Sequence, residues 1–413
     1  MSSDVVNKAA RYSPGHSALH ATSTNSQHSY KRHQGGRFLV PEQHHVEIKS
    51  AVVVRQQPNG AVPSNFLNGG QLDFRVERGI IDLLTHCYLQ FEVSNNTGAS
   101  ATIAPIQLCI DRIEIFSGNG SKLLTTIHGQ ELFLSNAFLS RNEFEQLDEL
   151  LGLTNTGNYA TTGDAIADGA TKVYYLPILN MFPSSKLCLS ALNSELLIRV
   201  YSQSASKTVL TGAVPSINNV ALLLKGFHEI PEMKQARQAV YNSQLPLVIP
   251  YANWQRMSVN LSLAANTEYS IVLSGLSGLV GSIFFTFRAS PTTAANQADY
   301  VLAAQSYDFQ LADGKSLTGH YRQTVNDRTI TCAENFENLF ANYKNFYIVP
   351  FTERITHDFV SGANSGYEVF SGFEKLSFST TSTLTPGSYV VDIRALTHEH
   401  LSIVKGNLSS SKP

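Results

Sequence analysis

The sequence predicts an all-β protein built from two antiparallel β-sandwich domains in tandem. Three observations lead to this prediction. From residue 46 onward, apolar and polar residues alternate in short runs, Gly, Asn and Ser separate the runs, and one helical segment divides two β-rich stretches of similar size. Alternation with a period of two places one face of a strand against a core. The strand–helix–strand rhythm of a parallel α/β sheet is absent from the sequence.

Length and composition agree with two domains. The chain has 413 residues, which is long for one ordinary domain. A folded body of this size buries about three quarters of its unfolded surface, so stability requires neither disulfides nor a metal. The net charge is −2, which argues against a protein that binds polyanions over its whole surface. Only 15% of residues are charged, as expected where flanks contact other subunits.

Residues 46–228 are predicted to form the first sandwich and residues 247–408 the second, followed by a tail at 409–413. The alternating runs of the first are LDFRVE (72–77), CYLQFEV (87–93), DRIEIFS (111–117), ELLIRVY (195–201) and NVALLLKGF (219–227). Those of the second are MSVNLSL (257–263), SIFFTFR (282–288), EKLSFS (374–379) and YVVDIRAL (389–396).

Helices are predicted at few places. Residues 229–246 form a linker helix, because Pro231 lies near its start and Pro246 follows its end. Residues 131–151 are expected to form one or two amphipathic helices inside a loop, with their clustered carboxylates on a solvated face. The 19 residues Tyr269–Phe287 carry no charge, yet their Gly and Ser residues favour two strands around a loop over a membrane span.

Residues 1–45 differ in composition from the rest of the chain. They are rich in Ser, His, Asn and Gln and poor in large apolar residues, which predicts an arm without its own core. Two interpretations stay open: a solvated tail, or an arm that orders against neighbouring subunits, a membrane or nucleic acid. No apolar signal region stands near the start, and the four cysteines form no CxxC pair, so we expect buried, reduced thiols and assembly in a reducing compartment.

The sequence offers no catalytic constellation. It contains no HExxH, GxSxG, P-loop or EF-hand motif. The triplet HEH at 398–400 resembles part of a cupin metal motif, but Val404 stands where a cupin needs Glu. We therefore predict a protein that is not an enzyme, with no cofactor, no metal site and no small-molecule substrate.

One segment carries a resemblance to a known family. The stretch YYLPILNMFPSSKLCLSALNSELLIRVY (174–201) resembles a strand, loop helix and return strand of the double jelly-roll major capsid proteins of icosahedral double-stranded DNA viruses. Leu176, Pro177 and Phe182 stand at the strand end, and Leu189 and Leu192 in the loop helix. Leu189 occupies a place where the family often has Pro-Leu, which brings the chain closer to virophage and polinton-like virus proteins.

Further stretches agree with that family in the same order along the chain. They are LLLKGFHEIPEMKQARQ (222–238), GLVGSIFFTFRAS (278–290) with Phe285, the segment 347–379 with Phe378, and the final two strands from residue 389. The stretch 278–290 lacks the His-Pro and Trp residues that the capsid proteins of large DNA viruses have there. Residues 46–170 fit only through their strand pattern.

The resemblance implies two tandem eight-stranded antiparallel jelly rolls, with short helices in loops and at the junction. It implies homotrimers that form pseudo-hexagonal capsomers and tile an icosahedral shell around a double-stranded DNA genome. Contacts within the trimer would come from loops 131–171 and 297–345. The partners implied are neighbouring capsomers, minor capsid proteins and penton proteins, with the N-terminal arm directed to an inner membrane, a minor protein or the genome. The implied location is the virion, assembled inside the host cell.

Two other classes of protein stay open. A carbohydrate-binding or glycan-processing β-sandwich is one, although a single tryptophan, Trp254, leaves little for stacking on sugars. A receptor-binding fibre or spike is the other, although such proteins usually show repeats.

Overall fold

The computed structural model covers most of the chain. It describes residues 48–138, 146–147, 149–153, 163–178, 187–235, 247–297, 299–311, 313–316, 323–335, 345–352 and 366–411. Several predictions therefore lie wholly or partly outside the described residues, among them the arm 1–45, the position of Phe182, and residues 236–246 of the linker helix.

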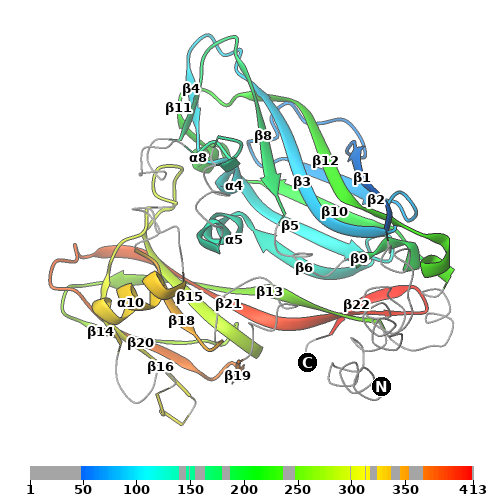
Figure 1. The fold of residues 1–413 in the computed structure, drawn as a ribbon. Helices are drawn as coiled ribbons and strands as arrows, with labels where there is room; N and C mark the ends of the chain where they lie inside the picture. Colours follow the sequence, from blue (N-terminus) through cyan, green and yellow to red (C-terminus); the bar gives the residue numbers. More distant parts are fainter. Residues whose placement is uncertain are drawn as a thin grey trace, which may run out of the picture.

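The first half of the chain forms a sandwich of two antiparallel sheets with a small third sheet at one end (Figure 1). The first sheet has the order β1 (Ile48–Gln56), β12 (Ser216–Glu229), β3 (Leu83–Ser94) and β8 (Thr171–Pro177), with β9 (Leu187–Cys188) paired to β3. The second has the order β2 (Gln71–Val76), β10 (Leu196–Ser202), β5 (Ile110–Ser117) and β6 (Lys122–His128). The small sheet contains β11 (Val209–Thr211), β4 (Ala101–Ile103) and β7 (Asp164–Ile166).

The second half forms another sandwich beside it (Figure 1). Its larger sheet has the order β13 (Leu247–Leu263), β21 (Gly387–Val404), β15 (Gly278–Ala289) and β18 (Tyr347–Pro350), with β19 (Glu368–Phe370) on β15 and β22 (Asn407–Ser411) on β21. Its smaller sheet has the order β14 (Glu268–Val272), β20 (Lys375–Thr380), β16 (Ala304–Gln310) and β17 (Gln323–Thr324).

The period-two pattern places side chains as predicted. In β2, Leu72, Phe74 and Val76 are buried while the residues between them are not. Burial alternates in the same way through the middle of β3. The all-β prediction is therefore confirmed, and the strand count of eight per sandwich stays a prediction.

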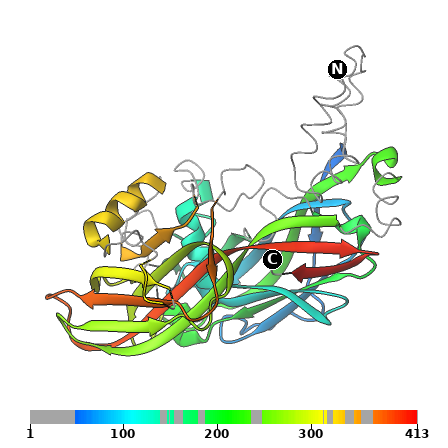
Figure 2. The same cartoon turned by 90° about the horizontal axis from the view of Figure 1, so that it is seen from below.

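The long antiparallel pair of strands β13 and β21 contributes to both cores. Its two strands pair continuously from Leu247↔Ile403 to Leu263↔Gly387. Figure 2 shows this pair of strands running from the second sandwich to a position beside the first. Side chains near one end, such as Tyr251, join the hydrophobic core of the first sandwich, whereas those near the other end join the core of the second.

The central strands of the larger second sheet are covered on both faces. Every residue from 280 to 288 in β15 is buried. Phe284 packs in the first core and its neighbour Phe285 in the second, so successive side chains serve different sandwiches. The first sandwich thus fills the face that an isolated second sandwich would expose to water.

The helices are short and lie in loops. They include α4 (Ile106–Cys109), α5 (Gly129–Leu134), η2 (Ser135–Phe138), η3 (Leu189–Ala191), α8 (Ala205–Thr208) and α10 (Val325–Asn335). The amphipathic prediction for 131–151 is wrong at its start, because all six residues of α5 are buried. A Cβ on Gly129 would lie 2.3 Å from the Gln107 carbonyl oxygen, so only glycine lets α5 approach α4 this closely.

Other predictions have mixed outcomes. Tyr269–Phe287 does form parts of two strands, β14 and β15, joined by a loop. Residues 409–411, assigned to a tail, continue strand β22 instead. Residues 231–235 are helical, and the division into separate domains at 229–246 stays a prediction. Among the described residues, no helix is both long and apolar enough to cross a membrane.

Candidate functional site at the junction of the two sandwiches

Four of the seven predicted motif residues gather at one end of the first sandwich. Leu176 and Pro177 close β8, and Leu189 begins η3, a single 3₁₀ turn. Leu192 follows this turn and donates its backbone N–H to the Leu189 carbonyl at 3.1 Å. All four are buried, and the leucines belong to the first core.

The remaining described motif residues lie in the second core. Phe285 of β15 stacks on Tyr347 with ring centroids 4.6 Å apart, and Phe378 of β20 contacts Phe287 at 5.1 Å. The six described motif residues are therefore packing residues in two separate cores and form no common site. Their role as family markers stays a prediction.

The loop after η3 also joins the two halves of the chain. Asn193 donates its backbone N–H to the Gly406 carbonyl at 2.9 Å, and its side-chain amide donates to the Lys405 carbonyl. Both acceptors lie in the turn between β21 and β22. Ser117 at the end of β5 donates its hydroxyl to the Leu408 carbonyl at 2.9 Å. These hydrogen bonds to backbone carbonyls attach the C-terminal hairpin, β21 and β22, to the first sandwich.

A buried group of charges occupies the middle of the junction. Asp392 of β21 is fully buried and accepts hydrogen bonds from Arg288 and Ser258. Arg256 approaches the same carboxylate at 3.3 Å. Arg394 is 1% exposed and lies 3.8 Å from the Glu131 carboxylate, beyond hydrogen-bond distance. Three arginines therefore face two carboxylates inside the protein.

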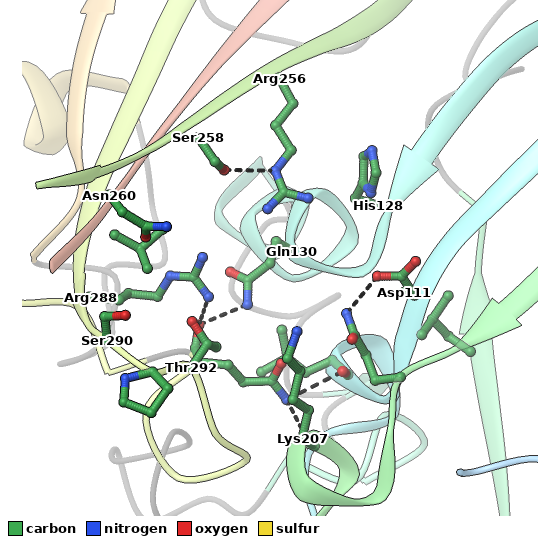
Figure 3. A pocket seen from close by; sticks show the side chains of 16 residues that line it. Asp111, His128, Gln130, Lys207, Arg256, Ser258, Asn260, Arg288, Ser290 and Thr292 are labelled. Atoms are coloured by element: carbon green, nitrogen blue, oxygen red, sulfur yellow. Dashed lines mark hydrogen bonds between the residues drawn. The ribbon is translucent and has the colours of Figure 1, made fainter. Parts of the chain in front are cut away.

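A cavity of about 420 Å³ opens beside these charges (Figure 3). Its walls come from both sandwiches: Asp111, His128 and Gln130 belong to the first, and Arg256 and Arg288 to the second. A chain of amides crosses it, because Gln130 donates to the Gln297 carbonyl at 2.7 Å and Gln297 donates to the Lys207 carbonyl at 2.8 Å. These hydrogen bonds fix the two sandwiches relative to each other.

Burial perturbs the titration of the groups around the cavity. It raises the pKa of Glu131 to about 7, against the opposing effect of Arg394. Glu131 also accepts the His128 backbone N–H at 2.7 Å, as part of a capping box on α5. Burial, with repulsion from Arg256 and Arg394, lowers the pKa of His128 to about 4. The imidazole is therefore neutral at neutral pH, whereas Glu131 is partly protonated.

Replacing Glu131 by Gln should change how stability depends on pH. Above pH 4.5 the unfolded chain loses the Glu131 proton while the folded protein retains it up to about pH 7. The difference between the two pKa values of Glu131 therefore lowers the free energy of unfolding as the pH rises. This free energy is highest below pH 4.5, and the full loss is reached once the pH has passed about 7. The difference in unfolding free energy, Glu131→Gln minus wild type, should grow by about 3 kcal/mol between these limits.

Urea titrations at half-unit steps from pH 4.5 to 8 would measure this difference. His128 acts in the opposite direction below pH 6.5, but it is present in both proteins, so its effect is removed by subtraction. Glu77→Gln, at an exposed glutamate, is the matched control and should leave the two curves parallel. Parallel curves for Glu131→Gln as well would contradict the burial of an ionisable carboxyl at this junction.

Sequence reasoning missed this group of charges. A signal was present, because YVVDIRAL and SIFFTFR each place charged residues in strands that are otherwise strongly apolar. Asp392 and Arg394 occupy positions on one face of β21, where the alternation rule reads them as solvent-facing. They are buried because the first sandwich covers that face.

The glutamate of the HEH triplet is held by hydrogen bonds, and three of the cysteines are buried. Glu399 accepts hydrogen bonds from the Tyr251 hydroxyl at 2.8 Å and the Asn253 amide at 3.0 Å. Cys87, Cys109 and Cys188 are buried free thiols, and burial raises the pKa of Cys87 to about 12. Thiols with raised pKa values are poor nucleophiles.

Known proteins resemble this chain in three-dimensional structure, whereas comparisons of sequence find no match. No protein-family model matches the chain, and no curated protein matches its sequence. A quasi-atomic model of the PBCV-1 virus capsid matches with a TM-score of 0.68 and 14% identity, over 91% of this chain and 99% of that chain. The fold is the double jelly roll. The Faustovirus major capsid protein (TM-score 0.62, 10% identity, 89% and 93% covered) and the mavirus major capsid protein (0.52, 10%, 90% and 93%) also match.

The double jelly roll accounts for the pairing of two similar sandwiches in one chain. Each sandwich described above is one roll, and the resemblance noted in the sequence is confirmed at the level of fold. The cavity and its charges lie between the two rolls, on the sheet face of the second roll that the first roll covers.

Proposed function

We propose that this protein is the major capsid protein of an icosahedral double-stranded DNA virus. The observation that supports the proposal is the double jelly roll, which extends over 91% of the chain and 99% of the chain from the PBCV-1 capsid. The Faustovirus and mavirus structures with this fold are likewise major capsid proteins. The proposed location is the virion, after assembly inside the host cell, and no enzymatic activity is expected.

In this proposal three chains form a homotrimer. Two rolls side by side in each chain make six in the trimer, which gives a pseudo-hexagonal block that can meet six neighbours. The buried junction supports this arrangement, because rolls fixed to each other act as one rigid tile. Minor capsid and penton proteins would fill the remaining positions of the shell. The N-terminal arm would contact an inner membrane, a minor protein or the genome.

Exposed apolar side chains mark candidate contact surfaces for the trimer. Ile330 on α10 is 58% exposed, and α10 lies within loop 297–345, where the sequence predicts trimer contacts. Tyr367, Val369 and Phe373 are also more than half exposed. Apolar groups clustered at a surface commonly mark an interface with another protein. The other predicted contact loop, 131–171, lies largely outside the described residues.

The proposal is tested by the mass of the purified protein. Light scattering after size exclusion should give about three times the chain mass of 45.2 kDa, and negative-stain images of that peak should show hexagonal particles. A monomer at all concentrations, with no larger assemblies, would overturn the proposal.

Ile330→Lys tests where the trimer contact lies. A lysine at an apolar contact must lose its hydration, so we expect the trimer dissociation constant to rise by about tenfold or more, with thermal stability of the monomer unchanged. Leu123→Lys, at a leucine 47% exposed on the first roll, is the matched control outside the predicted loops. Equal weakening by both variants, or by neither, would contradict a contact through α10.

The carbohydrate-binding alternative loses its best candidate residue. Trp254 is 5% exposed and packs against Phe284 with ring centroids 5.3 Å apart. A tryptophan inside the core presents no face on which a sugar ring can stack.

A further inference from the structure

The cavity between the rolls has an excess of positive charge. Lys207, Arg256 and Arg288 line it, and Asp111 is the one carboxylate among its lining residues. Both oxygens of Asp111 are already engaged, one by Arg112 at 2.8 Å and the other by Gln203 at 2.9 Å. Arg256 and Arg288 share the single carboxylate of Asp392, so the cations that line the cavity outnumber the carboxylates that balance them.

The buried carboxylates near the cavity, Asp392 and Glu131, do not remove this excess of positive charge. Asp392 is shared among the arginines of the junction, and Glu131 lies 3.8 Å from Arg394. Burial, with added repulsion from Arg394, lowers the pKa of Arg256 to about 10 and that of Arg288 to about 9. An additional anion among these groups would relieve the repulsion.

Side chains with hydrogen-bond donors line the same space. Arg288 is 4% exposed, and its Nε atom is buried with no hydrogen-bond partner among the described residues. Figure 3 shows the side chains of Arg256 and Arg288 extending toward the cavity, with Ser290 and Thr292 near Arg288. Arg256 is 32% exposed, so an ion from solvent can reach the group.

We propose that this inter-roll cavity binds a small oligophosphate. Guanidinium groups match phosphate oxygens with two parallel hydrogen bonds, and a lysine ammonium adds a point charge. A volume of about 420 Å³ falls in the range of small-molecule sites and exceeds what a single phosphate fills. Because Lys207 belongs to the first roll and the two arginines to the second, the bound anion joins the rolls. The ligand would stiffen the double jelly roll, whether or not the chain trimerises.

Thermal unfolding of the full chain with inorganic triphosphate tests the site. At matched ionic strength and without divalent cations, triphosphate should raise Tm in a saturable manner, while chloride and sulfate should not. ATP should be tested in the same way, because the oligophosphate could be free or part of a nucleotide. Tighter binding of ATP than of triphosphate indicates a nucleotide ligand, and equal binding of the two indicates a free oligophosphate. Stabilisation by citrate equal to that by triphosphate would overturn the assignment to phosphate.

Charge-removing variants locate the binding. Lys207→Gln and Arg256→Gln should each raise the triphosphate Kd, measured by calorimetry, by about tenfold, because each removes one charge-assisted contact. Lys122→Gln, at an exposed lysine of β6 that does not line the cavity, is the matched control and should bind as wild type. Arg288→Gln is avoided, since it would leave buried Asp392 without its principal partner. Equal affinities for all the variants and wild type, or no binding at all, would overturn the proposal.

Discussion

Leu192→Asp is expected to leave no soluble, folded protein. Leu192 is 3% exposed, follows the 3₁₀ turn η3 and packs within the core of the first roll. A carboxylate at this position would lose its hydration in an apolar environment, at a cost of several kcal/mol. That cost is a large part of the roughly 5–15 kcal/mol by which a folded protein is stable. The soluble fraction after expression and the far-UV circular dichroism would report the loss, and no trimer-sized species should elute in size exclusion.

Leu123→Asp separates the effect of burial from that of the new charge. Leu123 is 47% exposed on β6, so the same substitution there should change the free energy of unfolding by less than about 1 kcal/mol. A soluble and trimeric Leu192→Asp protein would show that the turn after β9 does not belong to the core.

Phe285→Ala is expected to destabilise the second roll by about 4 kcal/mol. The Phe285 ring is fully buried and lies within 6 Å of four other rings, those of Phe287, Tyr307, Phe309 and Tyr347. Removing it loses the burial of the ring and leaves a cavity among side chains that are fixed by their strands. Denaturant unfolding should show a lower midpoint for the variant, with the slope unchanged if unfolding stays two-state.

Phe373→Ala is the matched control for this loss. Phe373 is 67% exposed, so its truncation should alter the unfolding free energy of the monomer by less than about 0.5 kcal/mol. A cost for Phe285→Ala as small as that of the control would mean that the aromatic cluster is not closely packed.

The strands and the division into two β-rich halves could be predicted from the sequence alone. Alternation is a local property, because successive side chains of a strand point to opposite faces. The runs containing Leu72 and Phe74, or Tyr389 and Val391, therefore reveal a strand without any knowledge of its neighbours. The loop from Leu176 to Leu192 was recognisable for a different reason, since its order of residue types resembles a known family.

Which strands are buried on both faces, and where charged residues gather, depends on how the two rolls pack against each other. Alternation marks one buried face, but whether the opposite face meets water depends on distant parts of the chain. Thus Asp392 and Arg394 read as solvent-facing residues of a strand, and the first roll covers them. The buried state of Glu131 depends in the same way on contacts between the rolls. The cavity exists because residues from both rolls meet there, and no local pattern encodes a meeting of segments more than a hundred residues apart.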